Sequence, residues 1–152
     1  MKKSELKIMI KEEIQLLKEG YTLYWGKSAE PFTDDEWKKL LVQVKKILAI
    51  AKKKGIIIRD GNGKGKPIID NEKIVLNGDG EGEEDLSHET FYFTKKQDEW
   101  EFTKTNRKPY DAVVSSILYV AQKINPSIGA RGDDGKSSIK MGGTEGWDNQ
   151  YY

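Results

Sequence analysis

The chain has 152 residues, which is the usual size of one domain and is long enough to bury a substantial core. Its 26 basic and 25 acidic residues leave a net charge of only +1, so no bulk field favours nucleic acid or an anionic membrane. The lack of cysteine excludes disulfides and thiolate chemistry, and a single histidine excludes a two-histidine mechanism. Because no segment has the apolar length of a signal peptide or membrane span, we expect a cytoplasmic domain without membrane contacts.

The N-terminal region has the pattern of an amphipathic helix. Apolar residues recur at helical spacing from Leu6 to Leu17, which predicts a first helix over residues 4–19. An aromatic stretch follows at residues 21–25, and we expect it to be extended and to fold back over the helices.

A second helix is predicted over residues 34–53. Thr33 and Glu36 have the spacing of a capping box, in which each side chain satisfies a free amide at the start of the helix. Phe32 and Trp37 flank the cap as a hydrophobic staple.

From Gly55 onward the pattern changes to short extended runs separated by turn residues. The predicted strands are residues 56–58, 68–69, 74–76, 88–94 and 100–103. The composition of residues 95–98 is typical of a hairpin turn, so we expect the last two strands to pair with each other. Trp100 and Phe102 alternate with polar neighbours, as in a half-buried strand.

The third helix begins at Pro109, because proline has no amide hydrogen to leave unpaired at the first helical position. Its apolar face continues to Lys123, and residues 125–126 end it. The order of elements predicts one α+β domain over residues 1–128, with two N-terminal helices, antiparallel hairpins and one further helix packed on the sheet. Residues 129–152 are rich in glycine and predict a flexible segment, which Trp147 is expected to dock.

The start of the third helix carries the best candidate site. A helix N-terminus offers free amides and partial positive charge, which flanking cations strengthen, so phosphate or carboxylate is a suitable ligand. Phe102 lies close enough in sequence to stack on a base or ring. The predicted ligand-binding residues are Lys104, Asn106, Arg107, Lys108 and Tyr110.

The alternative interpretation of these residues is structural. In it, the segment is a strand-to-helix corner whose cations pair with Glu99, Glu101 or Asp111. The structural interpretation is the favoured one of the two. If Lys104 and Arg107 point to opposite sides, the anion site loses its basis.

Two polar loops have part of the pattern of known ligand loops. Residues 61–66 are rich in glycine but lack the spacing of a phosphate-binding loop. Asp60 begins a calcium-like sequence, yet Asn71 stands at the twelfth position in place of glutamate. Residues 77–89 contain six acids and no base, which suits either calcium or magnesium or, as we favour, a solvated turn. No metal or cofactor is predicted.

His88 and Thr90 match one half of the His-x-Thr pattern of the two-histidine phosphoesterases. That mechanism needs a second such motif, and the sequence has no second histidine. We therefore interpret His88 as a structural residue at a strand edge and predict no catalytic residue.

Two sets of three lysines, each with a spacing of seven residues, run along the second predicted helix. A ridge of this kind suits nucleic acid or an acidic partner, but no aromatic residues interleave with it, and lysine is the usual choice for a solvated face. We therefore do not expect nucleic acid as a partner. The lysines are Lys38, Lys39, Lys45, Lys46, Lys52 and Lys53. The tripeptide Arg131-Gly132-Asp133 spells an adhesion motif, which we interpret as accidental.

Several short blocks resemble a family of small, uncharacterised proteins of bacteria and their phages. The blocks are residues 63–67, 74–78 and 88–91 and, most specifically, the sequence Phe-Thr-Lys-Thr-Asn-Arg-Lys-Pro-Tyr-Asp at residues 102–111. That family commonly follows its helix with Ser-Asp-Gly and a tryptophan, whereas here residues 132–135 and Trp147 are separated by a longer glycine-rich insertion. The resemblance implies an intact domain of phage-like origin and no particular chemistry.

Three functional hypotheses follow, and the first two do not involve catalysis. In the first, a phage-type accessory protein in the host cytoplasm binds a small anionic or nucleotide ligand, or a host protein, at the Lys104–Tyr110 corner. In the second, the chain is a structural or assembly component of a virion. The third, an enzyme of unrecognised type, is the least favoured, because obvious nucleophiles, histidine pairs and metal ligands are absent from the sequence. The sequence leaves open whether the chain forms a homo-oligomer.

Overall fold

The computed structural model describes residues 21–26, 29–97 and 99–133, and this part of the chain combines α-helices with antiparallel strands. The α+β class is therefore confirmed. The predicted first helix and Trp147 lie outside the described residues. In chain order the elements are β1 (Thr22–Gly26), α2 (Asp34–Lys53), β2 (Ile58–Arg59), β3 (Ile68–Ile69), β4 (Lys73–Gly78), β5 (Phe91–Thr94), β6 (Trp100–Lys104), α3 (Tyr110–Ile124), the 3₁₀-helix η1 (Pro126–Ile128) and β7 (Arg131–Gly132).

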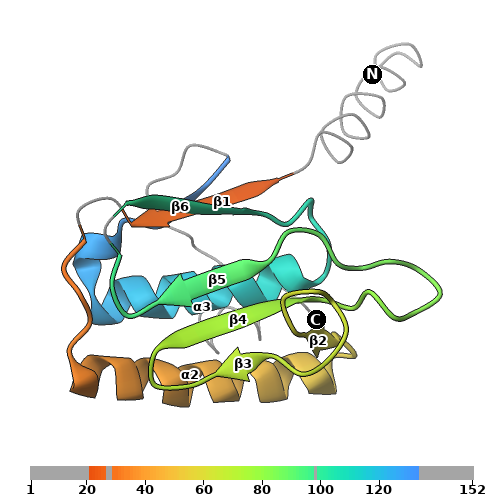
Figure 1. Ribbon diagram of the computed structural model, residues 1–152, viewed down its shortest axis with the longest axis horizontal. Helices are drawn as coiled ribbons and strands as arrows, with labels where there is room; N and C mark the ends of the chain where they lie inside the picture. The colour runs from red at the N-terminus through yellow and green to blue at the C-terminus, as the bar shows by residue number, and fades with distance from the viewer. Residues whose placement is uncertain (1–20, 27–28, 98, 134–152) are drawn as a thin grey trace, which may run out of the picture.

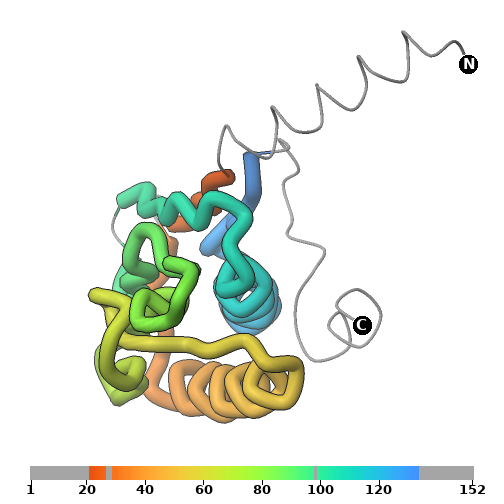
Figure 2. The backbone as a smooth tube through the Cα atoms, turned by 90° about the vertical axis from the view of Figure 1, so that its right-hand side faces the viewer, coloured from red at the N-terminus to blue at the C-terminus, as the bar shows by residue number. Residues whose placement is uncertain are grey.

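The described strands form two sheets with antiparallel pairing. The three-stranded sheet has the order β6-β1-β7, and β4 is the central strand of the second sheet, where it pairs with β2, β3 and β5. In Figure 1, β6 and β1 lie at the top of the molecule and α2 at the bottom, with β4, β5 and α3 between them. Figure 2 shows α3 nearly end on, above α2, against which it packs.

Helix α2 has the boundaries and the cap that its sequence predicts. The Thr33 hydroxyl accepts the amide of Glu36 at 3.1 Å, and the Glu36 carboxylate accepts the amide of Thr33 at 2.9 Å. The rings of Phe32 and Trp37 meet edge to face with 5.5 Å between their centroids. Capping box and staple are both confirmed, so local chemistry sets the start of this helix.

An aromatic cluster joins the two sheets inside the molecule. Trp25 of β1 contacts both Phe91 and Phe93 of β5, with ring centroids 5.2 and 6.0 Å apart. Trp37 of α2 stacks on Phe93 from the other side, at 6.1 Å. Both tryptophans are buried, and their indole N–H groups donate to Gln97 and to the carbonyl of Asp70. Large aromatic area is thus buried without an unsatisfied donor.

The predicted hairpin of β5 and β6 is wrong. Strand β5 pairs with β4, and β6 pairs with β1, so the two strands belong to different sheets. The connection between them crosses from one sheet to the other. Gln97 anchors it, because its side chain is buried, accepts the indole N–H of Trp25 at 3.1 Å and donates to the carbonyl of Thr94.

The alternation of Trp100 and Phe102 with polar neighbours predicts that these two side chains occupy the buried face of their strand, and this orientation is also wrong. Their side chains are 41% and 56% exposed, whereas Thr103 between Phe102 and Lys104 is buried. Successive side chains of a strand alternate between faces. Leu23 and Trp25 of β1 already fill the inner face, which leaves Phe102 on the outer face, opposite Tyr24.

The packed structure continues past the predicted boundary at residue 128. Ile128 and Ala130 are buried, and β7 then pairs with β1. The carboxylate of Asp133 accepts the amide of Thr22 at 2.8 Å. In the described ranges, no helix combines the length and the apolar composition that crossing a bilayer requires.

Candidate functional site

The turn between β6 and α3 has an unusual backbone. Asn106 and Arg107 have φ values of 52° and 54°, and among the described residues no other non-glycine residue has a positive φ. Asparagine tolerates this left-handed conformation, but for arginine it is unfavourable. The amides of Thr105 and Asn106 hold the turn by donating to the carbonyl of Tyr21, at 2.9 and 3.2 Å. Strained backbone of this kind is concentrated at functional sites, although it also occurs elsewhere.

The turn gathers four polar side chains, Lys104, Asn106, Arg107 and Lys108, which we call the basic corner. Lys104 and Arg107 are exposed and both lie beside the start of β1. Lys104 is paired in register with Thr22, and the guanidinium of Arg107 stands 4.4 Å above the centre of the Tyr21 ring.

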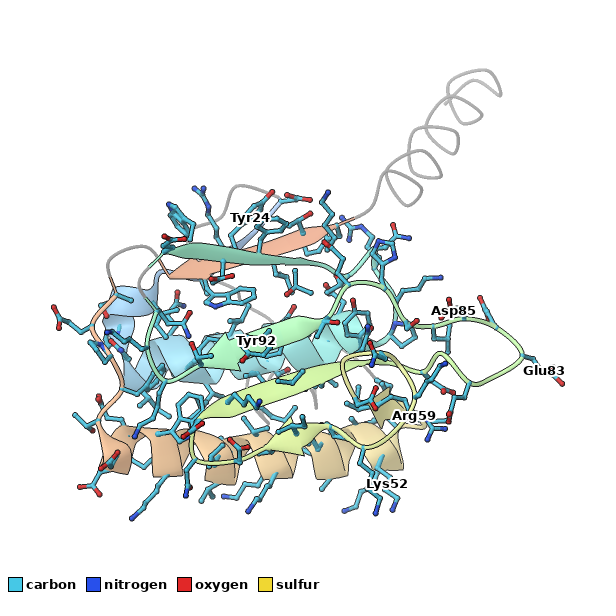
Figure 3. The ribbon with its side chains drawn as sticks, viewed as in Figure 1. Tyr24, Lys52, Arg59, Glu83, Asp85 and Tyr92 are labelled. Atoms are coloured by element: carbon cyan, nitrogen blue, oxygen red, sulfur yellow. The ribbon has the colours of Figure 1, made fainter. Side chains whose placement is uncertain are left out.

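Lys108 extends from the basic corner toward the long acidic loop. Its ammonium group donates to the carbonyl of Asp85 at 3.1 Å. Figure 3 shows Asp85 on that loop, which projects from the body of the molecule toward Glu83. The ammonium group of Lys108 is therefore partly used within the fold, whereas Lys104 and Arg107 are exposed.

The ion pairs expected in the structural interpretation are not found. In the described part of the chain, the ion pairs join Arg59 to Asp79 and Glu81, and Lys95 to Asp34. None of them includes a cation of the basic corner. The acid in contact with this part of β6 is Glu89, whose carboxylate accepts the backbone amide of Lys104 at 3.4 Å rather than pairing with its ammonium group.

Tyr110 lies inside the molecule, beneath the basic corner. Its side chain is fully buried, and its hydroxyl donates to the carbonyl of Glu89 at 2.7 Å, with the carbonyl of Lys104 at 3.3 Å. Burial, together with the nearby charges of Asp111 and Glu89, raises the pKa of the Tyr110 hydroxyl well above its usual range. Tyr110 thus supports the end of β6 and has no exposed ring surface for a ligand.

Asp111 is a partly buried acid in the first turn of α3. Burial raises the pKa of the Asp111 carboxyl, while a hydrogen bond from the Thr105 hydroxyl and the charge of Arg107 act in the opposite direction. Because Arg107 is not within ion-pair distance, its guanidinium stays open to solvent while it still contributes to the field at Asp111.

A second group of side chains, three of them exposed and one partly buried, lies beside the basic corner, on the outer face of the β6-β1-β7 sheet. We call Tyr24, Trp100, Phe102 and Arg131 the aromatic platform. The rings of Tyr24 and Phe102 are 6.3 Å apart, and the guanidinium of Arg131 stands 5.7 Å from the Tyr24 ring and 5.0 Å from the Trp100 ring. In Figure 3, Tyr24 lies at the top of the molecule.

Sequence reasoning named Phe102 as a stacking residue but missed the rest of the platform, for two reasons. The strand pattern suggested that Trp100 and Phe102 face inward, and Arg131 was interpreted as part of an accidental tripeptide. The usable signal was the alternation of Trp100, Phe102 and Lys104, which places two rings and a cation on one strand face. That β1 and β7 add Tyr24 and Arg131 to this face depends on long-range pairing.

The other sequence candidates are occupied by local contacts. The Asp60 carboxylate accepts the amides of Asn62, Lys64 and Gly65, so it closes its own loop. In the acidic loop, Asp79 is buried against Arg59. Within the described ranges no three acidic or histidine side chains come together as metal ligands would.

His88 and the lysine ridge of α2 are exposed. The side chain of Asn77 holds the backbone of His88, with both hydrogen bonds at 3.0 Å. The six lysines of the ridge all face solvent, on the side of α2 away from its buried residues. The lysine ridge thus has the placement that its structural interpretation expects, whereas His88 lies in the loop before β5 and not at a strand edge, because the strand predicted over residues 88–94 begins only at Phe91.

In comparisons with known proteins, no family, no curated protein and no solved structure matches the chain. The resemblance to small bacterial and phage proteins therefore stays a prediction. Any assignment of function rests on the geometry of the basic corner and the aromatic platform.

Proposed function

We propose that this protein acts by binding and not by catalysis, and that its basic corner receives a small anionic ligand such as a nucleotide. The single observation that supports this most strongly concerns the ion pairing of the three cations in the basic corner. Lys104, Arg107 and Lys108 lie within five consecutive residues, and in the described part of the chain no carboxylate pairs with any of them.

The surrounding contacts fit this role. A cation without a counter-ion favours an anionic partner, and arginine presents a planar fork of donors that matches phosphate oxygens. The backbone that carries Asn106 and Arg107 is anchored to Tyr21, and Tyr110 anchors the end of β6 from inside. The donors of the basic corner are thus held on a supported turn, which reduces the entropy lost when a ligand binds.

Thermal shift in the presence of phosphate compounds tests the proposal. A ligand that binds the folded state at about 100 times its Kd stabilises by about 2.7 kcal/mol, which for this chain length is a rise in Tm of roughly 5 to 10 °C. We expect such a rise with inorganic pyrophosphate or a nucleoside diphosphate and not with a neutral nucleoside.

Substitutions show whether the ligand binds at the basic corner or at any cationic part of the surface. Arg107→Asn removes the cation and keeps a residue that tolerates a left-handed backbone, and Lys104→Gln removes the second cation from an exposed strand position. Each should abolish most of the shift, whereas Lys45→Gln on α2 should leave it unchanged. An equal loss with the Lys45 variant, or no shift with any anion, would refute the proposal.

A further inference from the structure

The aromatic platform continues the basic corner as one surface. Trp100, Phe102 and Lys104 occupy alternate positions of β6 and so share its outer face. Tyr24 is opposite Phe102 on β1, and Arg131 is opposite Tyr24 on β7. Rings and cations therefore lie across three neighbouring strands.

This face is open in a part of the fold where aromatic residues would normally be covered. The Phe102 ring is 56% exposed and that of Trp100 41%, although the same sheet buries Leu23 and Trp25 on its inner side. Exposed rings grouped with arginine mark a binding surface rather than a scatter of apolar residues.

The charges on and beside the platform select the chemistry of the partner. Arg131 and Lys104 have no ion pair among the described residues. Arg107, which has none there either, adds a third cation just after the end of β6. Asp133, the acid that follows β7, accepts the amide of Thr22 with one carboxylate oxygen. A partner of this surface must therefore supply flat rings and several negative charges together.

We propose that the aromatic platform and the basic corner together bind single-stranded nucleic acid. Unpaired bases stack on Tyr24 and Phe102, while Lys104, Arg107 and Arg131 contact phosphates. Exposed aromatics on an open sheet face, flanked by cations, are a general solution for single strands, because every base has a ring face and the strand carries one charge per nucleotide. A duplex hides the faces of its bases, so the same surface has little for it to stack on.

The proposal rests on the proposed function, because it assigns the phosphate contacts to the same corner, and it extends the site to the sheet. It also revises the expectation that nucleic acid is not a partner. That expectation came from the small net charge and from the lysine ridge of α2, which has no interleaved aromatics. The pairing of β1, β6 and β7 creates the combination on a different surface.

Fluorescence anisotropy with labelled oligothymidine of about 10 nucleotides tests the inference, since single-strand sites span roughly 4 to 16 nucleotides. We expect the full chain to bind the single strand at least about tenfold more tightly than a duplex of the same length or than thymidine monophosphate. Binding should weaken with salt, because phosphate contacts release counter-ions.

Two variants with matched controls assign the contacts. Phe102→Leu keeps an apolar strand residue and removes the ring, so affinity should fall roughly 5- to 100-fold, whereas Tyr92→Leu, at a 52% exposed tyrosine on β5, should have no effect. Arg131→Gln should weaken binding and reduce its salt dependence, and Lys46→Gln on α2 should do neither.

The outcomes separate the two proposals. If pyrophosphate and the oligonucleotide bind equally, and Phe102→Leu changes nothing, the basic corner binds anions but the platform takes no bases, and the inference is wrong. If no anion binds, both are wrong. Preference for the duplex, or stable capture of an acidic protein with no binding of single strands, also overturns the inference. Circular dichroism and unfolding of each variant show whether it is folded, so that a loss of binding can be assigned to the lost group.

Discussion

Tyr24 and Trp25 are neighbours on β1, yet they lie in opposite environments. Trp25 is buried among Phe91 and Phe93, and its indole N–H has a partner in Gln97. Tyr24 is on the outer face, where it meets Phe102 and Arg131 instead of the core. One strand thus contributes to two aromatic clusters, and only the inner cluster is needed to hold the two sheets together.

Aromatic content alone therefore does not distinguish the core from a binding surface. The two clusters differ in the residues that surround their rings. The inner rings are surrounded by apolar residues, and their polar atoms are satisfied internally. The outer rings are interleaved with cations that have no ion pair in the described ranges.

The largest expected effect is on stability at the inner cluster. Trp25→Ala removes a buried aromatic side chain and leaves a cavity, so we expect a loss of about 3 to 5 kcal/mol in the free energy of unfolding. Phe102→Ala removes an exposed ring from an edge strand and should cost about 1 kcal/mol or less. Urea unfolding of both variants measures the difference. Equal costs would mean that the outer rings are part of the core, which would contradict the comparison.

A smaller effect is expected in the pH dependence of stability, beneath the basic corner. The pKa of Asp111 is raised in the folded state, so folding favours the protonated carboxyl. The stability that this group contributes is therefore present below its ordinary pKa of 3.8, and it is lost as the pH rises from 3.8 through the pKa of the folded state. Asp111→Asn should therefore match the wild type in acid and become the more stable of the two as pH rises.

Asp60 provides the opposite case for the same measurement. Three backbone amides donate to its carboxylate and lower its pKa, so its stabilising contribution is present above the ordinary value and is lost as pH falls. Asp60→Asn should thus lose stability relative to the wild type at neutral pH and approach it in acid. Urea midpoints at several pH values between about 3 and 7 test both signs. If the Asp111 variant follows the Asp60 pattern, the carboxyl of Asp111 is stabilised as the anion, which would contradict a pKa raised by burial.

The sequence was sufficient where structure depends on local chemistry. The capping box at Thr33 and Glu36 and the staple of Phe32 and Trp37 predict the start of α2, and proline at position 109 predicts the start of α3, because each acts within a few residues. The basic corner was predicted for the same reason, since its cations are consecutive in the chain.

The sequence was insufficient where structure depends on which strands meet. Nothing local to β6 indicates that its partner is β1, which precedes it by almost eighty residues, rather than the adjacent β5. A hairpin of β5 and β6, as predicted, would leave Phe102 facing inward and apart from Tyr24. Helical periodicity places Tyr110 on the apolar face of the third helix, and its burial agrees with that. Its assignment to the ligand site is wrong, because its hydroxyl is engaged by the carbonyls of Glu89 and Lys104, which only the folded chain brings together.

The most direct test of the central claim is ultraviolet crosslinking of the protein to single-stranded oligothymidine, followed by mass spectrometry of the crosslinked peptides. The account predicts crosslinks at Tyr24, Trp100 or Phe102, and their loss when a large excess of unlabelled single strand competes. Crosslinks located instead on α2, at Tyr92, or spread evenly over the surface would contradict it.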